Sequence, residues 1–192
     1  NLTWPNKQNI VLKGTASASQ VILNGSGSNS VIQVLNAVSL NIQNITLENG
    51  TTSGQGGAIA AALSGITLAM NDCIVSANQK SGIYFGGTGT FTNVTFNNNT
   101  SSGGGALSVL NTAKAVLDRC VFRTNQASNN GGGFLLSLGS STTFNACIFE
   151  NNSATQGGAG TCYAPARFTN CLFISNNAAA AGGALRNDAA GT

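Results

Sequence analysis

Short apolar runs that end at glycine or at polar residues mark the first 41 residues of the chain. Four such runs follow one another at intervals of about ten residues: Ile10–Gly14, Val21–Gly25, Val31–Leu35 and Val38–Ile42. Apolar runs of this length, bounded by turn-forming residues, are typical of β-strands. From residue 42 the pattern becomes regular, with apolar and polar residues alternating inside short segments. We predict a single all-β domain over residues 1–192, with irregular N-terminal coils (1–41) and regular repeats (42–192).

The regular part repeats a unit of about 25 residues. Each copy carries a small or apolar residue at its fourth position, Phe or an aliphatic residue at its sixth, and usually Asn three residues later. The copies are Met70–Asn78, Phe91–Asn99, Leu117–Asn125, Phe144–Asn152 and Phe168–Asn176, with a weaker one at Ile42–Gly50. A glycine pair recurs between the copies, in Gly56–Ile59, Gly104–Leu107, Gly132–Leu135, Gly157–Gly160 and Gly182–Leu185. A fixed period of this length is the signature of a solenoid.

The fourth and sixth positions of each unit point to the same side of a strand, because successive side chains of a strand alternate between its faces. The units lack the 3.6-residue period of helical repeats. We therefore predict a parallel β-helix of about seven coils stacked ~4.8 Å apart, in which equal positions form ladders. Glycine pairs suit its corners, and Asn suits its turns because it tolerates left-handed φ and its amides can hydrogen-bond along a ladder. The alternative, a β-sandwich, does not account for the period.

The combination of FxxN with GGA[ILV] resembles the repeat signature of the polymorphic outer membrane proteins. Here FxxN stands at Phe96/Asn99, Phe122/Asn125, Phe149/Asn152 and Phe173/Asn176. The opening segments NIVLKG, VILNG and NITLENG are similar to the start of many pectin-lyase-like right-handed β-helices. The resemblance implies a single-stranded, right-handed parallel β-helix. For function it implies a surface-exposed domain of a kind implicated in adhesion.

Charged residues make up 7% of the chain, with eight Lys and Arg, five Asp and Glu, no His and a net charge of +3. The eight cations are well separated and form no basic patch, so we expect no nucleic-acid partner. Without His, and with scattered carboxylates, neither a Ser-His-Asp triad nor a metal cluster can be assembled. The most apolar stretch, Gly56–Met70, is shorter than the ~20 residues of a membrane span. We expect no cofactor, no metal ion and no membrane span in this chain.

Enzymes with the β-helix architecture, such as pectate lyases and polygalacturonases, need clustered carboxylates for Ca²⁺ binding or for acid–base catalysis. In this chain Glu48 and Glu150 share a ladder position but lie four coils apart, about 19 Å. We therefore expect no catalytic residues and no enzymatic activity. The same ladder position brings Arg123 next to Glu150 on adjacent coils, which predicts a surface ion pair worth under ~1 kcal/mol.

Four of the five cysteines take the fourth position of their units, which Ile45 and Val94 take in other copies. They are Cys73, Cys120, Cys147 and Cys171. A position that accepts Ile, Val or Cys is an inward core site, so we predict buried free thiols. A disulfide between neighbouring coils stays open: the ~4.8 Å spacing allows it, but parallel side-chain directions give it poor geometry. Cys162 lies outside this ladder, and we expect Trp4 to be a core or cap residue.

Eight Asn-x-Ser/Thr sequons offer candidate N-glycosylation sites, at Asn1, Asn24, Asn44, Asn49, Asn93, Asn98, Asn99 and Asn151. In the sequons of Asn44 and Asn93, the Asn and the Thr flank an inward residue, so we expect both to point outward. Outward polar residues that carry no sugar fit the pattern equally well. In a secreted protein such positions would be acceptors.

Two classes of function fit these features. The first is a structural or adhesive β-helix module, extracellular or at the cell surface, that is either a segment of a longer rod or a subunit that stacks end to end with itself into a filament. The second is a polysaccharide-binding module, for which Tyr84 and Tyr163 are the evident exposed aromatic residues. A relative of polysaccharide lyases or hydrolases is a distant alternative, and so is ice binding. The expected partners are copies of the chain itself or cell-surface and glycan ligands.

Overall fold

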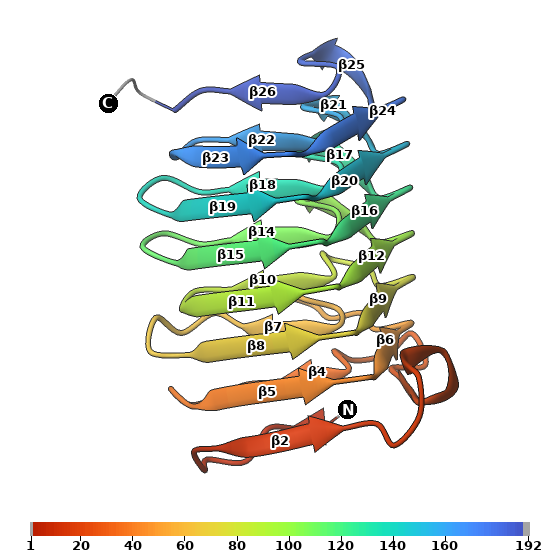
Figure 1. Cartoon of the computed structure of the whole chain (residues 1–192), viewed down its shortest axis with the longest axis vertical. Coiled ribbons are helices and arrows are strands. Elements are labelled where there is room, and N and C mark those ends of the chain that lie inside the picture. Colours follow the sequence, from red (N-terminus) through yellow and green to blue (C-terminus); the bar gives the residue numbers. More distant parts are fainter. Residues whose placement is uncertain (1, 190–192) are drawn as a thin grey trace.

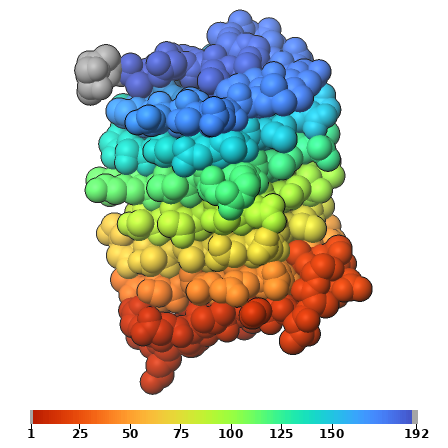
Figure 2. Space-filling view, viewed as in Figure 1, coloured from red at the N-terminus to blue at the C-terminus, as the bar shows by residue number. Residues whose placement is uncertain are grey.

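The chain winds through about seven coils that stack along one axis, so that each coil forms one layer of the molecule (Figures 1 and 2). The computed structural model describes residues 2–189. Four sheets run along the stack, and successive strands of each sheet come from successive coils and pair in parallel. This arrangement is the predicted parallel β-helix. No helix in the described part of the chain has the length and apolarity needed to cross a membrane.

Two of the sheets form the broad flanks of the stack. Sheet A consists of β1 (Leu2–Thr3), β4 (Ile32–Gln33), β7 (Ile59–Ala61), β10 (Ile83–Phe85), β14 (Leu107–Val109), β18 (Phe134–Leu136), β22 (Gly160–Cys162) and β26 (Leu185–Asn187). Sheet B consists of β2 (Ile10–Lys13), β5 (Ser39–Gln43), β8 (Thr67–Asn71), β11 (Thr88–Thr92), β15 (Lys114–Asp118), β19 (Ser141–Asn145) and β23 (Ala166–Thr169).

The other two sheets close each coil. Sheet C consists of β3 (Ile22–Asn24), β6 (Thr46–Glu48), β9 (Ile74–Ser76), β12 (Thr95–Asn97), β16 (Val121–Arg123), β20 (Ile148–Glu150) and β24 (Leu172–Ile174). Sheet D occurs only in the later coils and consists of β13 (Thr100–Gly103), β17 (Gln126–Asn130), β21 (Ser153–Gln156) and β25 (Asn177–Ala181). A single 3₁₀ turn, η1 (Ala18–Gln20), lies between β2 and β3.

The core is built from ladders of identical or similar side chains. In sheet C the sixth position of every unit points inward, and Phe96, Phe122, Phe149 and Phe173 occupy it on four successive coils. Their rings stack with centroid distances of 4.6, 5.0 and 4.7 Å. Earlier coils place aliphatic residues there. Trp4 is also buried in the core, as predicted.

Non-glycine residues with left-handed φ form the corners of the coils. One residue of this kind follows the sheet B strand and another follows the sheet C strand: Asn44, Asp72, Asn93, Arg119, Ala146 and Asn170 at the first corner, and Asn49, Ala77, Asn98, Thr124, Asn151 and Ser175 at the second. Both predicted roles of Asn are confirmed, in different residues. Six of these left-handed residues are Asn, whereas the recurring Asn of FxxN follows the left-handed residue, and its amide hydrogen-bonds along a ladder inside the coil.

The glycine pairs serve two different needs. The first glycine has left-handed φ, as at Gly104 (φ +63). The second has no room for a side chain, because a Cβ on Gly105 would lie 2.1 Å from the carbonyl oxygen of Gly132 on the next coil. One predicted alignment is wrong: Phe134 pairs with Leu107, so the unit begins at Gly131 (φ +66) and not at Gly132. Three consecutive glycines, Gly131 to Gly133, offer two possible pairs, and the sequence pattern does not show which pair forms the corner.

Candidate functional site

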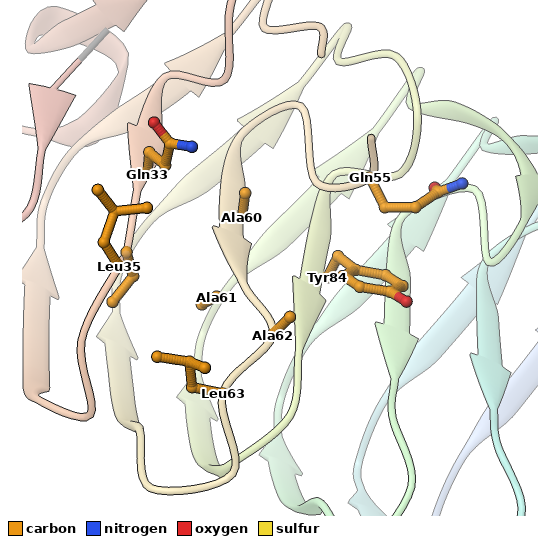
Figure 3. Close-up of a pocket in the computed structure, with 9 residues that line it drawn as sticks. Gln33, Leu35, Gln55, Ala60, Ala61, Ala62, Leu63 and Tyr84 are labelled. Atoms are coloured by element: carbon orange, nitrogen blue, oxygen red, sulfur yellow. The ribbon is translucent and has the colours of Figure 1, made fainter. Parts of the chain in front are cut away.

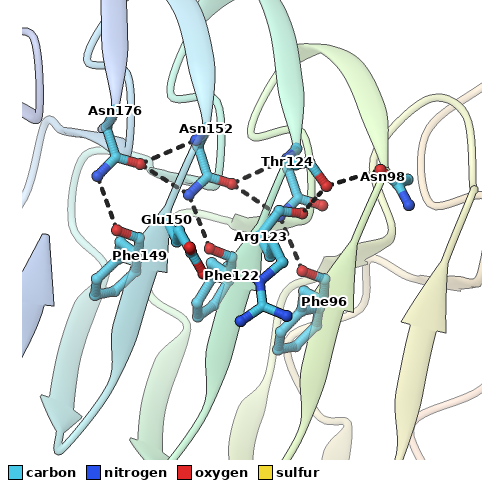
Figure 4. A network of polar contacts seen from close by, with 10 residues as sticks. Phe96, Asn98, Phe122, Arg123, Thr124, Phe149, Glu150, Asn152 and Asn176 are labelled. Carbon is cyan, nitrogen blue, oxygen red and sulfur yellow. Dashed lines mark hydrogen bonds and ion pairs between the residues drawn. The ribbon is translucent and has the colours of Figure 1, made fainter. Parts of the chain in front are cut away.

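Asparagines on successive coils form an internal ladder of hydrogen bonds (Figure 4). It runs through Asn78, Asn99, Asn125, Asn152 and Asn176, all on the corner after sheet C. Asn125 shows the pattern: its Oδ1 accepts hydrogen bonds from both N and Nδ2 of Asn99 at 3.0 and 2.9 Å. Its Nδ2 donates to Phe96 O and to Asn152 Oδ1, each at 3.0 Å.

An amide has two donors and two acceptor lone pairs, so all four are used inside the ladder. The ladder ties each coil to the one before it and the one after it. The inner members Asn99, Asn125 and Asn152 are therefore structural and offer no free polar group for chemistry, whereas Asn78 and Asn176 at the two ends of the ladder each use three of their four positions.

Each carboxylate of the chain is held by a neighbour of its own. Glu150 Oε2 lies 2.8 Å from Arg123 Nε across one coil spacing, which confirms the predicted ion pair and the register behind it (Figure 4). Asp118 pairs with Arg119, Asp188 with Arg186, Glu48 accepts from Asn24, and Asp72 accepts from Asn93. Carboxylates engaged one by one on different coils do not form the facing pair that glycoside hydrolysis requires.

All five cysteines are free, and the predicted burial is confirmed for Cys73, Cys120 and Cys147, whereas Cys171 is half-buried; Cys162, outside the ladder, is also buried. Within residues 2–189 no three His, Cys, Asp or Glu side chains come close enough to hold a metal ion. Burial raises the pKa of Cys162 to about 11 and also raises the pKa of Cys73 and Cys171. The pKa of Cys147 is raised by its hydrogen bond with Cys120 and then by burial. Thiols that stay protonated are poor nucleophiles and poor metal ligands.

The sequons divide into exposed and unavailable ones. Asn24, Asn49, Asn93, Asn98 and Asn151 are exposed and Asn44 is half-buried, whereas Asn1 lies outside the described residues. Asn99 is fully buried, and its Nδ2 donates to Val75 O and Asn125 Oδ1 inside the ladder, so no sugar can be attached there in this structure. Thr46 points outward from β6, in the same column as Ile74, but it is buried because η1 covers this face and Ala18 O accepts a hydrogen bond from its hydroxyl.

A groove on the outer face of sheet A is the candidate binding site (Figure 3). Gln33, Ala60 and Tyr84 follow one another on strands β4, β7 and β10 of neighbouring coils. Because Ala60 is small and its two neighbours are large, the surface is hollowed between them. The hollow has a volume of about 330 Å³. Figure 3 shows Gln33 and Leu35 on one side, Tyr84 with Gln55 beside it on the other, and alanines between.

The lining of the groove carries no charge, and its polar side-chain groups are the amides of Gln33 and Gln55 and the hydroxyl of Tyr84. It consists of Gln33, Val34, Leu35, Gln55, Ala60, Ala61, Ala62, Leu63 and Tyr84. Leu35 and Leu63 are 58% and 42% exposed, so the groove opens an apolar surface to solvent. The sequence singled out Tyr84 but not the groove. The run Ala60–Ala62 between larger residues on adjacent coils was the signal that could have found it.

Comparisons with known proteins support the fold. The family model described as "Right handed beta helix region" matches residues 30–190. Neither a search of curated proteins nor a search of solved structures finds a match. The match includes most of the regular coils and confirms the predicted right-handed, pectin-lyase-like class of β-helix. It does not distinguish the polymorphic outer membrane protein type of repeat, which stays a prediction.

Proposed function

We propose that this chain, which belongs to the right-handed β-helix family, is a rigid, non-catalytic module that presents its flanks for adhesion outside the cell. The observation that carries the proposal is the asparagine ladder from Asn78 to Asn176, whose inner members use all four hydrogen-bonding positions of the amide. A buried amide whose four hydrogen bonds all go to neighbouring coils resists sliding and bending, since any displacement leaves buried polar groups unpaired. A stack held in this way is suited to bear load or to hold a surface at a distance.

The carboxylates support a non-catalytic role. Catalysis by two carboxylates needs a separation of about 5 to 9.5 Å between them. Glu48 and Glu150 are on one ladder but four coils apart, about 19 Å at ~4.8 Å per coil. The other carboxylates are each engaged by a local partner. The proposal therefore sets aside the lyase or hydrolase alternative.

An activity screen tests the non-catalytic part of the proposal. The protein is incubated with polygalacturonate and with neutral polysaccharides, with and without Ca²⁺, while reducing ends and unsaturated products are measured. We expect the same background as with the Glu48→Gln and Glu150→Gln variants. Turnover that disappears in either variant would contradict the proposal.

Retention on surfaces tests the adhesive part. Beads coated with the folded protein are passed over cells and over insoluble polysaccharides, and their retention is compared with beads coated with the same protein after denaturation. We expect retention only of the folded form. Equal retention of the folded and denatured beads would overturn the adhesive role.

Electron microscopy of the protein tests the filament form. End-to-end assembly would give unbranched fibres with a subunit rise of ~34 Å, which is seven coils at ~4.8 Å each.

The extracellular location is tested through the sequons. Asn93, Asn98 and Asn151 are exposed at or next to corners, so an oligosaccharyl group can be attached there without disturbing the core. After expression through a eukaryotic secretory pathway, we expect glycans at these positions and none at the buried Asn99. Peptide mapping by mass spectrometry locates them. A glycan on Asn99 would show that the ladder forms differently from this structure.

A further inference from the structure

We infer that the groove between Gln33 and Tyr84 binds one residue of an uncharged saccharide, with Tyr84 as the wall against which the sugar ring lies. This inference rests on the proposed adhesive function, to which it adds the ligand class and the site. Its first support is the shape of sheet A. The outward position of successive strands carries Gln33, Ala60, Tyr84, Ser108, Leu135 and Thr161.

Of these residues, Ala60 is the smallest and stands between two of the larger ones. The strands of Gln33 and Tyr84 are two coil spacings apart, about 10 Å. A flat ring lying along β7 fits between them. The volume of about 330 Å³ is at the lower end for ligand sites, which suits one or two sugar residues and not a large cofactor.

The chemistry of the lining defines the class of ligand. The groove has no Lys, Arg, Asp or Glu. A charged ligand would lose water there and gain no partner, which is unfavourable. Acidic polysaccharides such as polygalacturonate are therefore the wrong ligands, although the fold hosts enzymes that act on them.

The remaining side chains match the two kinds of surface on a pyranose. The C–H faces of the ring are apolar and pack on Tyr84 and on Leu35 and Leu63. The hydroxyls at its edge need both donors and acceptors, and each of the amides of Gln33 and Gln55 supplies both. Gln55 Oε1 is only weakly engaged, at 3.5 Å from Ser101 Oγ, so its amide is able to turn toward a ligand.

Titration of the folded protein with neutral oligosaccharides, followed by NMR or calorimetry, tests the inference. The probes are cello-, xylo-, manno- and malto-oligosaccharides, with oligogalacturonate as the charged comparison. We expect at least one neutral series to bind and oligogalacturonate not to bind. Tyr84→Ala should weaken binding about tenfold, and Tyr84→Phe should keep most of it, because the ring and not the hydroxyl makes the contact.

Ala60→Leu fills the groove from its floor and should abolish binding while leaving the core unchanged, since Ala60 points outward. The matched control is the Tyr163→Ala variant. Tyr163 is half-buried and lies outside the groove, so this variant should bind the saccharide as tightly as the original chain does. Melting curves of all variants exclude loss of folding as the cause.

Binding that survives both Tyr84→Ala and Ala60→Leu would overturn the inference, and so would a preference for oligogalacturonate or displacement of the sugar by an apolar peptide. The two proposals fail differently. If no saccharide binds but beads coated with the protein are still retained on cells, the adhesive function stands and the saccharide groove is wrong. If turnover depends on a carboxylate, the proposed function is wrong whatever the groove binds.

Discussion

In the later coils an asparagine with its amide inside the coil stands at the corner after each sheet C strand, whereas Gly50 takes this position in the second coil, where its N donates to Asn78 Oδ1. The inward residue of the strand changes in parallel, from Leu23 and Leu47 to the stacked phenylalanines. Sheet D is also confined to the later coils. The first coils are instead covered on one side by η1, which accepts a hydrogen bond from Thr46.

The two regions show two ways to hold one coil on another. Aliphatic contacts in the first coils are non-directional, so each pair of coils is held independently of the others. The asparagine ladder is directional, and each amide needs both neighbours to satisfy its hydrogen bonds. We therefore expect the later coils to respond to single substitutions more steeply than the first coils.

The largest difference should come from the stacked rings. Phe122→Ala removes a fully buried ring that stacks on Phe96 and Phe149, and it should lower the free energy of unfolding by about 3 to 5 kcal/mol. Leu23→Ala, at the same ladder position but only partly buried, should cost about half as much. Urea denaturation followed by circular dichroism measures both. Equal losses would show that the two regions pack equally tightly.

The asparagine ladder should show the next largest effect. Asn125→Leu leaves the backbone N of Asn99 without its partner Asn125 Oδ1 and the carbonyl oxygen of Phe96 without its partner Asn125 Nδ2, and Nδ2 of Asn99 keeps only its bond to Val75 O. At about 1 to 3 kcal/mol for each unsatisfied buried group, with some relaxation, we expect a loss of roughly 3 kcal/mol. Hydrogen exchange should be accelerated at the Asn99 amide and in the coils on either side.

The matched control is Asn98→Gly. Asn98 is the exposed residue with left-handed φ (+54) at the corner before Asn99, and glycine adopts this conformation without steric strain. It should change the free energy of unfolding by no more than about 0.5 kcal/mol. If Asn125→Leu costs no more than this control, the ladder does not hold the coils together.

Much of the regular region could be predicted because its residues repeat in register. The period places Arg123 beside Glu150, and it places Cys73, Cys120 and Cys147 at a buried position; both predictions are confirmed. Periodicity works here because each coil lies directly on the previous one, so a position in the unit has a fixed direction in space.

Features outside the repeat were predicted less well, for physical reasons. The burial of Thr46 depends on η1, which belongs to no repeat. The left-handed corners accept Ala, Thr and Arg as well as Asn, so no residue type marks them. The groove needs Gln55 from a loop together with residues of three coils, and its depth comes from small side chains, which carry no motif.

Alkaline pH should affect the later coils selectively, because all five cysteines lie between residues 73 and 171. Burial raises the pKa of Cys162 from 9.0 in the unfolded chain to about 11. Below pH 9 the thiol is protonated in both states and its burial stabilises the fold fully. As the pH rises through 9 toward 11, the unfolded chain ionises first, so stability should fall by up to about 2 to 3 kcal/mol.

The measurement is the free energy of unfolding at pH 8, 9, 10 and 11 for the original chain and for Cys162→Ala. The variant should be less stable at pH 8 but should lose less stability on going to pH 11, because it lacks the buried thiol and the two proteins are otherwise identical. Identical slopes for the two proteins would mean that Cys162 is accessible to solvent. Hydrogen exchange at pH 10 should also show the first coils, which contain no cysteine, to be less affected.

The smallest effect is expected in the outward column of sheet C, where the two regions use different partners for the same carboxylate position. In the first coils Asn24 Nδ2 donates to Glu48 Oε1 at 2.9 Å, and in the later coils Arg123 Nε contacts Glu150 Oε2 at 2.8 Å. The Arg123 and Glu150 side chains are 54% and 27% exposed, so solvent screens their attraction and the pair should contribute less than about 1 kcal/mol.

Arg123→Gln replaces the charge by an amide and makes this contact resemble the one at Asn24. We expect a loss of a few tenths of a kcal/mol that vanishes in 1 M NaCl, where the Debye length is about 3 Å, whereas Asn24→Ala should cost a similar amount at any salt concentration. A double-mutant cycle with Glu150→Gln isolates the pair, and a coupling energy that persists at high salt would show that the later coils exclude solvent from their flanks as well as from their core.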